Sequence, residues 1–377
     1  MRKKLTDMCT IQYGYAFDSK EFTDNSNFPQ LVRIRDVKRG YSETFFRGKY
    51  SLEYVIHTGD LLIGMDGEFN IARWRSGDAL LNQRVCKVTV KEDVDEEYLR
   101  FSLSRALKQI ENRTSFVTVK HLSTKELNSL ELECPNIQKQ KEISDRLVKI
   151  EEIISLRQQQ LAKLDELVKA RFVEVFGNPL DGTAKYPIHQ VGKVAEAVDP
   201  QPSHRTPPIE EDGIPYISIK DCDYKTGVID FQGARRVSTK VLEEHLQRYT
   251  LHDGDFVIGK IGTIGQPIFV PSRKDYALSA NIVLIQPDSE LVSPYFLKYS
   301  FESDFVERQF AEAKNSTSQA AFGIQKVRTI EVMDPDLDVQ RTFERFTKQI
   351  DKLKLSIRKS LEQMEILKKA LMQKYFG

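Results

Sequence analysis

The sequence predicts an α+β protein with a pseudo-two-fold internal repeat: two similar β-rich domains separated by two long helices that form an antiparallel coiled coil. Two observations support this fold class. The unusual stretch HTGDLLIGMDG at residues 57–67 returns as HDGDFVIGKIG at residues 252–262. Two segments without glycine or proline, 137–176 and 339–376, carry apolar residues at heptad spacing.

Four further matches follow the same order in both halves. They pair RIRDV (33–37) with SIKDC (218–222), ALLNQRVCKV (79–88) with ALSANIVLI (277–285), YLRF (98–101) with YFLK (295–298), and CPNIQKQKEI (134–143) with DPDLDVQRTF (334–343). Ordered self-similarity of this kind indicates a duplicated structural unit. We therefore expect a first domain at 1–136, a central helix at 137–178, a second domain at 179–336 and a C-terminal helix at 337–377.

Each domain should be built from short strands. The segments rich in β-branched and aromatic residues are FPQLVRIRDV, GDLLIG and RVCKVTV in the first half, and IPYISI, GDFVIG and NIVLIQP in the second. Gly, Asp, Asn and Pro separate them, as expected of turns and loops. We expect a twisted, largely antiparallel sheet or partial barrel with a few small helices. A loop motif present twice further suggests a ligand with two halves.

The two helical segments should pair with one another. Each would be about 60 Å long at ~1.5 Å per residue, and a lone helix would leave its apolar stripe in water. Two independent surface helices are the alternative. The residues expected to pair the helices or to dock partner proteins are Ile143, Leu147, Ile150, Ile154, Leu161, Leu164 and Val168 in the first, and Phe343, Ile350, Leu353, Ile357, Leu361, Met364 and Leu371 in the second. Arg157 and Arg171 interrupt the first stripe. Both helices end in Phe-Gly, and such a glycine is a natural left-handed stop.

Composition favours a cytoplasmic globular protein. Hydrophobic residues make up 40% and charged residues 29%, and no apolar run approaches the ~18 residues of a membrane span. The N-terminus lacks the apolar region of a secretion signal. Four scattered cysteines without C-x-x-C spacing fit a reducing compartment, and neither they nor the six histidines suggest a metal site. The net charge of +1 gives no overall attraction to nucleic acid, so any DNA-binding surface should be local.

The sequence contains no recognisable active site. GDFVIGK (254–260) is one residue short of a phosphate-binding loop, its hydroxyl position is Ile261, and its centre reads as a strand. No N-P-P-aromatic or D-P-P-aromatic string of an amino-methyltransferase is present, and GNPLDG (177–182) has Leu180 where an aromatic ring should stack on a flipped base. We therefore expect a non-catalytic chain without metal or cofactor.

Polar residues on the duplicated loops are candidates for DNA contact. Arg and Lys can neutralise phosphates or read guanine, Asn and Gln can read adenine, and small hydroxyls can donate to phosphate oxygens. The candidates in the first half are Arg33, Arg35, Lys38, Arg39, Arg73, Arg75, Arg84, Arg113, Thr114, Ser115 and Lys120. Those in the second half are Lys220, Lys225, Lys260, Asn315, Ser316, Thr317, Ser318 and Gln319. The alternative for each is an ordinary solvated loop residue.

This arrangement resembles the specificity subunit of type I restriction–modification enzymes over the whole chain. The resemblance rests on the two Gly-Asp-apolar-Gly segments (59–64 and 254–259), the P-x-x-x-x-Q strings at 135–140 and 335–340, and the polar segments at 112–121 and 315–325. Members of that family have two target-recognition domains joined by two long helices that form an antiparallel spacer. Each motif alone is loose, but their doubled order is specific.

The resemblance implies a sequence-specific DNA-binding subunit in phage defence. Each domain would read one half of a bipartite site on double-stranded DNA, and the helices would dock two modification (methyltransferase) subunits. Two restriction subunits could join them. S-adenosylmethionine would then be held by the modification subunits, and ATP and Mg²⁺ by a restriction subunit. Because the halves differ in sequence and residues 178–336 are net acidic, the half-sites should differ.

Two other functions fit parts of this pattern. A single-chain modification methyltransferase would need a cofactor loop and a flipped-base motif, and neither occurs in the sequence. A non-catalytic coiled-coil adaptor with two protein-binding β domains remains open because the net charge is close to zero. DNA affinity in the presence of partner subunits discriminates this adaptor from a specificity subunit.

Overall fold

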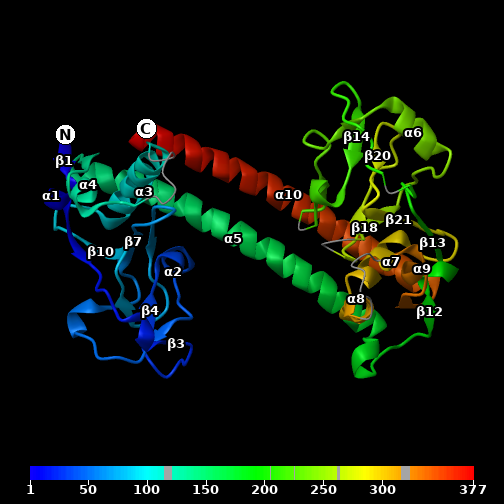
Figure 1. Cartoon of the computed structure of the whole chain (residues 1–377), viewed down its shortest axis with the longest axis horizontal. Coiled ribbons are helices and arrows are strands. Elements are labelled where there is room, and N and C mark those ends of the chain that lie inside the picture. Colours follow the sequence, from blue (N-terminus) through cyan, green and yellow to red (C-terminus); the bar gives the residue numbers. More distant parts are fainter. Residues whose placement is uncertain (114–120, 204, 225, 261–263, 316–322) are drawn as a thin grey trace. The chain divides into compact units, whose positions relative to one another are not determined.

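The computed structural model describes residues 1–113, 121–203, 205–224, 226–260, 264–315 and 323–377. The chain divides into two compact units (Figure 1). The first comprises Met1–Gln159 and Arg358–Gly377, and the second comprises Gln160–Ile357. The long helices α5 (Ile137–Phe176) and α10 (Leu337–Phe376) each contribute one half to each unit. The expected central helix is thus present as α5, which begins after Asn136 and ends before Gly177. Gly177 has a φ of +81°, a left-handed conformation that stops the helix.

The first unit contains two larger sheets and one small one. The sheet β2-β10-β7-β8 is antiparallel, and a second sheet has the order β3-β5-β4-β9-β6. Strands β1 and β11 pair separately. The strands are β1 (Arg2–Lys4), β2 (Cys9–Tyr13), β3 (Phe22–Thr23), β4 (Gln30–Val32), β5 (Phe45–Phe46), β6 (Val55–Ile56), β7 (Leu61–Gly64), β8 (Asn70–Arg73), β9 (Ala79–Leu81), β10 (Val85–Val90) and β11 (Glu131–Glu133). The helices are α1 (Leu5–Met8), α2 (Ile34–Arg39), α3 (Glu96–Arg113) and α4 (Thr124–Asn128), with one half each of α5 and α10.

The second unit repeats this plan. Its main sheet has the order β13-β21-β18-β19, and β17-β14-β20, β15-β16 and β12-β22 form smaller sheets. The strands are β12 (Ile188–Gln190), β13 (Ala195–Val198), β14 (Ile214–Ile217), β15 (Cys222–Asp223), β16 (Val228–Ile229), β17 (Arg236–Val237), β18 (Phe256–Gly259), β19 (Ile268–Phe269), β20 (Ala277–Leu278), β21 (Ile282–Pro287) and β22 (Glu331–Met333). The helices are α6 (Thr239–Leu246), α7 (Pro294–Phe301), α8 (Asp304–Asn315) and α9 (Ile324–Arg328).

Equivalent strands pair in the same way in both units. The main sheets correspond strand by strand, and a parallel strand pair occurs in each unit, β4–β9 in the first and β14–β20 in the second. The predicted fold class is therefore confirmed. One strand prediction was too long: in FPQLVRIRDV only Gln30–Val32 is a strand, because the next residues turn into α2.

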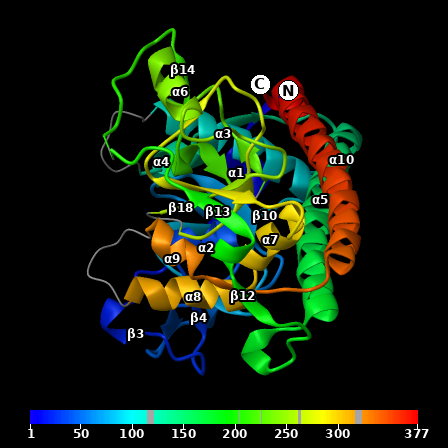
Figure 2. The ribbon, with the colours of Figure 1, turned by 90° about the vertical axis from the view of Figure 1, so that its right-hand side faces the viewer.

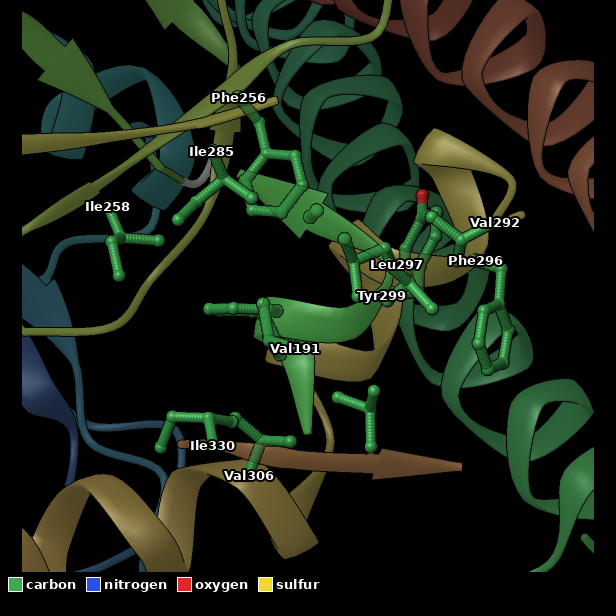
Figure 3. Close-up of a cluster of buried hydrophobic side chains, with 14 of the residues drawn as sticks. Val191, Phe256, Ile258, Ile285, Val292, Phe296, Leu297, Tyr299, Val306 and Ile330 are labelled. Atoms are coloured by element: carbon green, nitrogen blue, oxygen red, sulfur yellow. The ribbon is translucent and has the colours of Figure 1, made fainter. Parts of the chain in front are cut away.

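Each unit has its own core, to which the long helices contribute. In the first unit, Ile143 and Leu147 of α5 pack with Tyr98 and Phe101 of α3 and with Leu371 of α10. In the second, Phe172 and Phe176 of α5 join Phe343 of α10 in the largest cluster. Figure 3 shows that cluster, in which side chains of the sheet, including Phe256 and Ile285, and of α7, including Phe296 and Leu297, gather in one apolar interior.

The chain's two ends lie together in the first unit (Figure 2), where Arg2 and Gly377 line the same groove. Within the described ranges, no helix is both long and apolar enough to cross a membrane.

Candidate nucleic-acid interface

The duplicated Gly-Asp motif is a turn that leads into a buried strand. The backbone N–H of His57 donates to Oδ2 of Asp60 at 2.9 Å, and His252 donates to Asp255 at 2.8 Å in the same way. Gly59 and Gly254 have φ of +99° and +98°, which glycine adopts without strain. Strands β7 and β18, which follow, are fully buried. The described part of the motif thus builds the scaffold, and its interpretation as a binding loop stays a prediction.

A second duplicated turn carries exposed cations. The N–H of Arg33 donates to Oδ2 of Asp36 at 2.9 Å, and the N–H of Ser218 donates to Asp221 at 2.8 Å. These two segments, 33–36 and 218–221, are called the cap turns below. The carboxylate of Asp36 is buried and fixes the backbone, whereas the side chain at the third position of each cap turn, Arg35 or Lys220, is exposed.

Further candidate cations of the first unit gather around the first cap turn. Helix α2 continues from it and ends at Gly40, and Lys38 and Arg39 on this helix are exposed. Lys38 forms an exposed ion pair with Glu68 at 3.1 Å. The exposed Arg75 lies against Gly40, where an added Cβ would be 3.0 Å from its side chain. Arg33, Arg35, Lys38, Arg39 and Arg75 thus belong to one exposed basic region.

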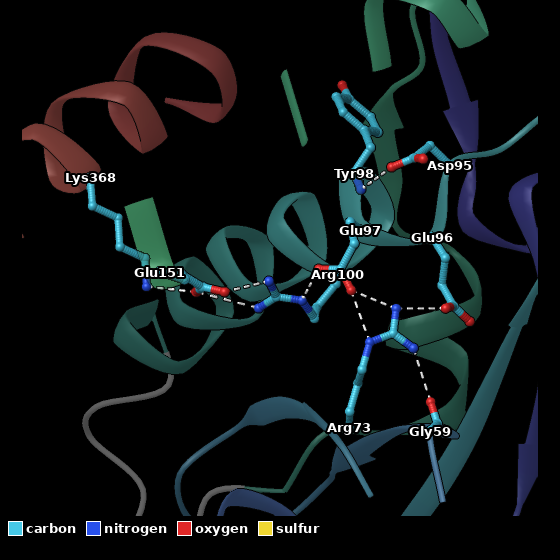
Figure 4. Close-up of polar contacts among 9 residues, drawn as sticks. All are labelled: Gly59, Arg73, Asp95, Glu96, Glu97, Tyr98, Arg100, Glu151 and Lys368. Carbon is cyan, nitrogen blue, oxygen red and sulfur yellow. Dashed lines mark hydrogen bonds and ion pairs between the residues drawn. The ribbon is translucent and has the colours of Figure 1, made fainter. Parts of the chain in front are cut away.

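Arg73 does not belong to that region, because its guanidinium is held inside the unit (Figure 4). It donates to the carbonyl of Gly59 at 2.9 Å and to Glu97 at 2.8 Å, and it lies 2.6 Å from Glu96. Arg100 continues the chain of charges from Glu97 to Glu151, which also pairs with Lys368 at 2.7 Å. These contacts connect strand β8 to three helices of the first unit, so we leave Arg73 out of the candidate interface.

Arg84 lies in a separate polar cluster of the first unit. Its Nε is 3.5 Å from Asp66, and Asp66 also contacts His121 at 2.5 Å. Arg84 is the one residue other than glycine with positive φ in the described part of the chain, at +72°. Arg113, another candidate, is exposed at the end of α3.

The structure places fewer candidates of the second unit. Lys220 is exposed, but Lys260 is only 5% exposed and its ammonium lies 2.8 Å from Asp199, so it is not on the surface. Asn315 ends helix α8, and its side chain is outside the described part. Also outside the described residues are Thr114, Ser115, Lys120, Lys225, Ser316, Thr317, Ser318 and Gln319.

The described residues contain no group of His, Cys, Asp and Glu that could hold a metal ion. Burial raises the pKa of the Cys9, Cys86 and Cys222 thiols to about 12, which keeps them protonated and unreactive near neutral pH. The candidate residues that the structure places on the surface are therefore cationic side chains on two similar scaffolds.

Comparison with known proteins decides the family. A family profile described as "Type I restriction modification DNA specificity domain" matches residues 1–166 and 204–366. The chain belongs to this family. Its function is DNA sequence recognition in type I restriction–modification, and it is a non-catalytic chain.

Individual relatives cover most or all of the chain. The type I restriction enzyme EcoBI specificity subunit of Escherichia coli is 25% identical over all of this chain and 85% of its own length. The MjaVIII specificity subunit of Methanocaldococcus jannaschii is 21% identical over 85% of this chain and 79% of its own length. The crystal structure of the S subunit from M. genitalium has the same fold, with a TM-score of 0.62 at 12% identity, covering 100% of this chain and 96% of that one.

In this specificity-family chain the long helices pair through a heptad seam. Most of the residues predicted to pair them are buried or half-buried, including Leu147 and Ile150 of α5 and Phe343 and Ile350 of α10. Leu353 is 52% exposed, so of the two roles predicted for this set, helix pairing or partner docking, only docking fits its position. The next residue, Lys354, takes the seam position and pairs with Asp165 of the second unit. In the first unit Lys368 takes a seam position and pairs with Glu151.

Three structural features of the specificity fold were not found from sequence. The seam lysines follow the alternation of four and three that begins at Phe343, so strict heptad counting would have found them even though they are polar. The capping aspartates were visible in the matched RIRDV and SIKDC strings, but were not recognised as structural. The left-handed backbone of Arg84 had no sequence signal, because glycine, Asn or Asp usually occupy such positions.

Proposed function

We propose that this chain reads a bipartite, asymmetric DNA site, one half with each unit, and that its helices dock two methyltransferase subunits. The single observation that supports split reading is the pair of cap turns. The same backbone turn, fixed by the same aspartate contact, carries an exposed Arg35 in one unit and an exposed Lys220 in the other. Two similar scaffolds that present different side chains to DNA suit two different half-sites.

The surroundings of the cap turns differ in a way that supports asymmetry. In the first unit Arg33 precedes Arg35, and α2 adds Lys38 and Arg39. In the second, Ser218 takes the place of Arg33, and the turn ends after a short 3-10 segment, Ile219–Asp221. Because phosphate neutralisation scales with the number of cations, the first unit should account for more of the salt dependence of DNA binding.

Partner docking is supported by exposed apolar residues beside the seam. Ile153 and Leu367 in the first unit are 39% and 42% exposed, and Leu167 and Leu353 in the second are 47% and 52% exposed. Each pair lies at the level of a seam ion pair: Ile153 and Leu367 next to Glu151–Lys368, and Leu167 and Leu353 next to Asp165–Lys354. Exposed apolar groups in equivalent places suit two copies of one partner.

The chemistry would then belong to the partners. S-adenosylmethionine would be bound by the methyltransferase subunits, and ATP and Mg²⁺ by restriction subunits where these join the complex. Such a complex would act in the cytoplasm, where it has access to the cell's DNA and to invading phage DNA.

Methylation sequencing of the source genome tests the split site. Deleting the gene should abolish one split motif, and Arg35→Ala or Lys220→Ala should weaken recognition of one half only. Equal weakening of binding to all DNA sequences would identify the residue as a contact to the DNA phosphate backbone. If the motif set were unchanged by gene deletion, the DNA-reading proposal would fail, and the protein-binding adaptor would replace it.

Native mass spectrometry with the methyltransferase subunit tests docking. Leu367→Asp and Leu353→Asp should each remove one bound copy, and the double variant should bind none, because a charge would be buried in each interface. The exposed Lys359→Asp, also on α10, serves as the control for added acidity and should keep both copies. Two bound copies on the double variant would place docking elsewhere.

A further inference from the structure

One turn of the main sheet makes matching backbone hydrogen bonds in both units but carries a different side chain at its last position, Arg84 with its left-handed backbone in the first unit and Asn281 in the second. In the first unit, the N–H of Met65 donates to the carbonyl of Arg84 at 2.8 Å, and Val85 donates to Asn82 at 3.2 Å. In the second, Lys260 donates to Asn281 at 2.9 Å, and Ile282 donates to Ser279 at 3.3 Å. Val85 pairs with Gly64 as Ile282 pairs with Gly259. Arg84 and Asn281 are therefore structurally equivalent.

The turn that carries Arg84 is held rigidly. Gly14 approaches it so closely that an added Cβ would lie 2.1 Å from the carbonyl oxygen of Asn82. The N–H of Gln83 donates to the carbonyl of Tyr15 at 2.7 Å. Within this frame Arg84 keeps a φ of +72°, which is unfavourable for a side chain of its size. Strain of this kind is retained where the surrounding structure enforces it, and such positions cluster at functional sites.

Both side chains are oriented by a neighbour and remain accessible. Asp66 lies 3.5 Å from Nε of Arg84, and the Arg84 side chain is 49% exposed. His121, bridged to Asp66 through the backbone, lies 2.9 Å from Nη1 of Arg84. In the second unit the Ser279 hydroxyl donates to Oδ1 of Asn281, and Asn281 is half-buried. These contacts involve Nε and Nη1 of Arg84 and Oδ1 of Asn281, and both side chains remain partly exposed.

We propose that Arg84 and Asn281 are equivalent base-reading residues, Arg84 for a guanine in one half-site and Asn281 for an adenine in the other. Arg forms paired hydrogen bonds with O6 and N7 of guanine, and Asn with N6 and N7 of adenine. Asp66 and Ser279 would orient these groups before DNA binds, so that less side-chain freedom is lost in the complex. This inference rests on the proposed function and deepens it by naming the reading residues.

Competitive methylation by the complete complex, on a DNA library randomised within each half-site, tests the inference. Arg84→Gly removes the guanidinium, and glycine adopts the turn's φ freely, so the variant should fold. It should lose roughly 5- to 150-fold of discrimination at one guanine position in one half-site, the range of a paired base contact. Arg84→Asn should shift that position toward adenine. Asn281→Ala should relax one adenine position in the other half-site.

The exposed neighbour Gln83→Ala is the matched control and should leave both half-sites unchanged. A wild-type complex that marks no split motif would overturn the proposed function and this inference together. A split motif whose base preferences are unchanged in Arg84→Gly and Asn281→Ala would overturn this inference alone. Thermal unfolding of each variant shows that a loss of discrimination does not arise from misfolding.

Discussion

At the residue scale, Gln140 and Gln340 explain why the P-x-x-x-x-Q string occurs twice. The Gln140 side chain donates to the carbonyl of Pro135 at 2.8 Å and accepts from the N–H of Asp95 at 2.9 Å. Gln340 does the same with Pro335 at 2.7 Å and Ser293 at 2.8 Å. Both glutamines are 1% exposed. Each one therefore joins the start of a long helix to the start of α3 or α7, a structural role.

Replacing either glutamine should destabilise only its own unit. Gln140→Leu leaves a buried N–H and a buried carbonyl without partners, at about 1–3 kcal/mol for each unsatisfied group. Hydrogen exchange should therefore accelerate in α3 and the first turns of α5, and Gln340→Leu should have the same effect on α7 and α10. The exposed Gln138→Leu, two residues earlier on the same helix, is the control and should change neither. Unaltered protection in Gln140→Leu would contradict this role.

A buried histidine should make the second unit sensitive to acid. His245 is 1% exposed, and its ring nitrogens lie 2.9 Å from the Tyr249 hydroxyl and 2.7 Å from Oε1 of Gln201. Burial lowers the pKa of His245 to about 4, against an ordinary value of 6.5. The unfolded chain therefore takes up this proton first, so the stabilisation is complete above pH ~6.5 and is lost as the pH falls toward 4.

The stabilisation lost through protonation of His245 should reach roughly 3 kcal/mol as the pH falls toward 4. Urea unfolding of wild type and His245→Gln at several pH values measures it, because the difference in unfolding free energy between them should shrink as the pH falls from 7 to 4. Gln247→Ala, at an exposed position two residues along the chain, removes no titrating group and should show no such trend. A constant difference between wild type and His245→Gln would show that His245 does not titrate in this way.

At the element scale, the helix bounds and the heptad positions were predictable, but the partners of the polar seam residues were not. Uninterrupted helix formers between Asn136 and Gly177 define α5 from sequence alone. Leu353 was included among the pairing or docking residues because it is apolar, whereas the structure places Lys354 in the seam. A lysine becomes a seam residue only when an acid on the opposite helix meets it, and Asp165 is 189 positions away in sequence. Residue type alone could not show that contact.

Lys354 and Lys368 should fix the register in which α5 and α10 pair, but should add little to the stability of the fold. A polar residue at a heptad core position selects register and oligomeric state, whereas buried ion pairs add little net stability. Lys354→Leu with Lys368→Leu should therefore melt at the same or a higher temperature, and a fraction of the chains should form larger assemblies in light scattering. Lys352→Leu with Lys359→Leu, at exposed positions of α10, controls for added apolar surface. A lower melting temperature without new assemblies would mean that the ion pairs act as stabilisers.

At the scale of the whole molecule, the two units share a backbone plan but not its chemistry. The ordered repeats predicted the shared plan, since matched motifs occupy matched turns and strands. They could not predict the chemistry of the junctions with the long helices. Strand register makes Phe269 the equivalent of Arg73, and the starts of α3 and α7 make Tyr295 the equivalent of Glu97. The rings of Phe269 and Tyr295 pack in a tilted arrangement, with centroids 4.7 Å apart, where the first unit has an ion pair.

This difference predicts that salt acts unequally on the two units. Burial alone would raise the pKa of Glu151, but hydrogen bonds and charge from Arg100 and Lys368 hold it below its usual range, so the folded first unit favours the charged carboxylate. Salt weakens partly buried pairs by about 1 kcal/mol or less and leaves aromatic packing intact. Hydrogen exchange between low salt and about 1 M NaCl should accelerate several-fold in α3 relative to α7. Arg100→Met should remove most of that difference, whereas the paired but exposed Arg308→Met should not. Equal acceleration in α3 and α7 would contradict this prediction. It would show that the junction held by the ion pairs in Figure 4 is no more sensitive to salt than the junction held by the aromatic pair.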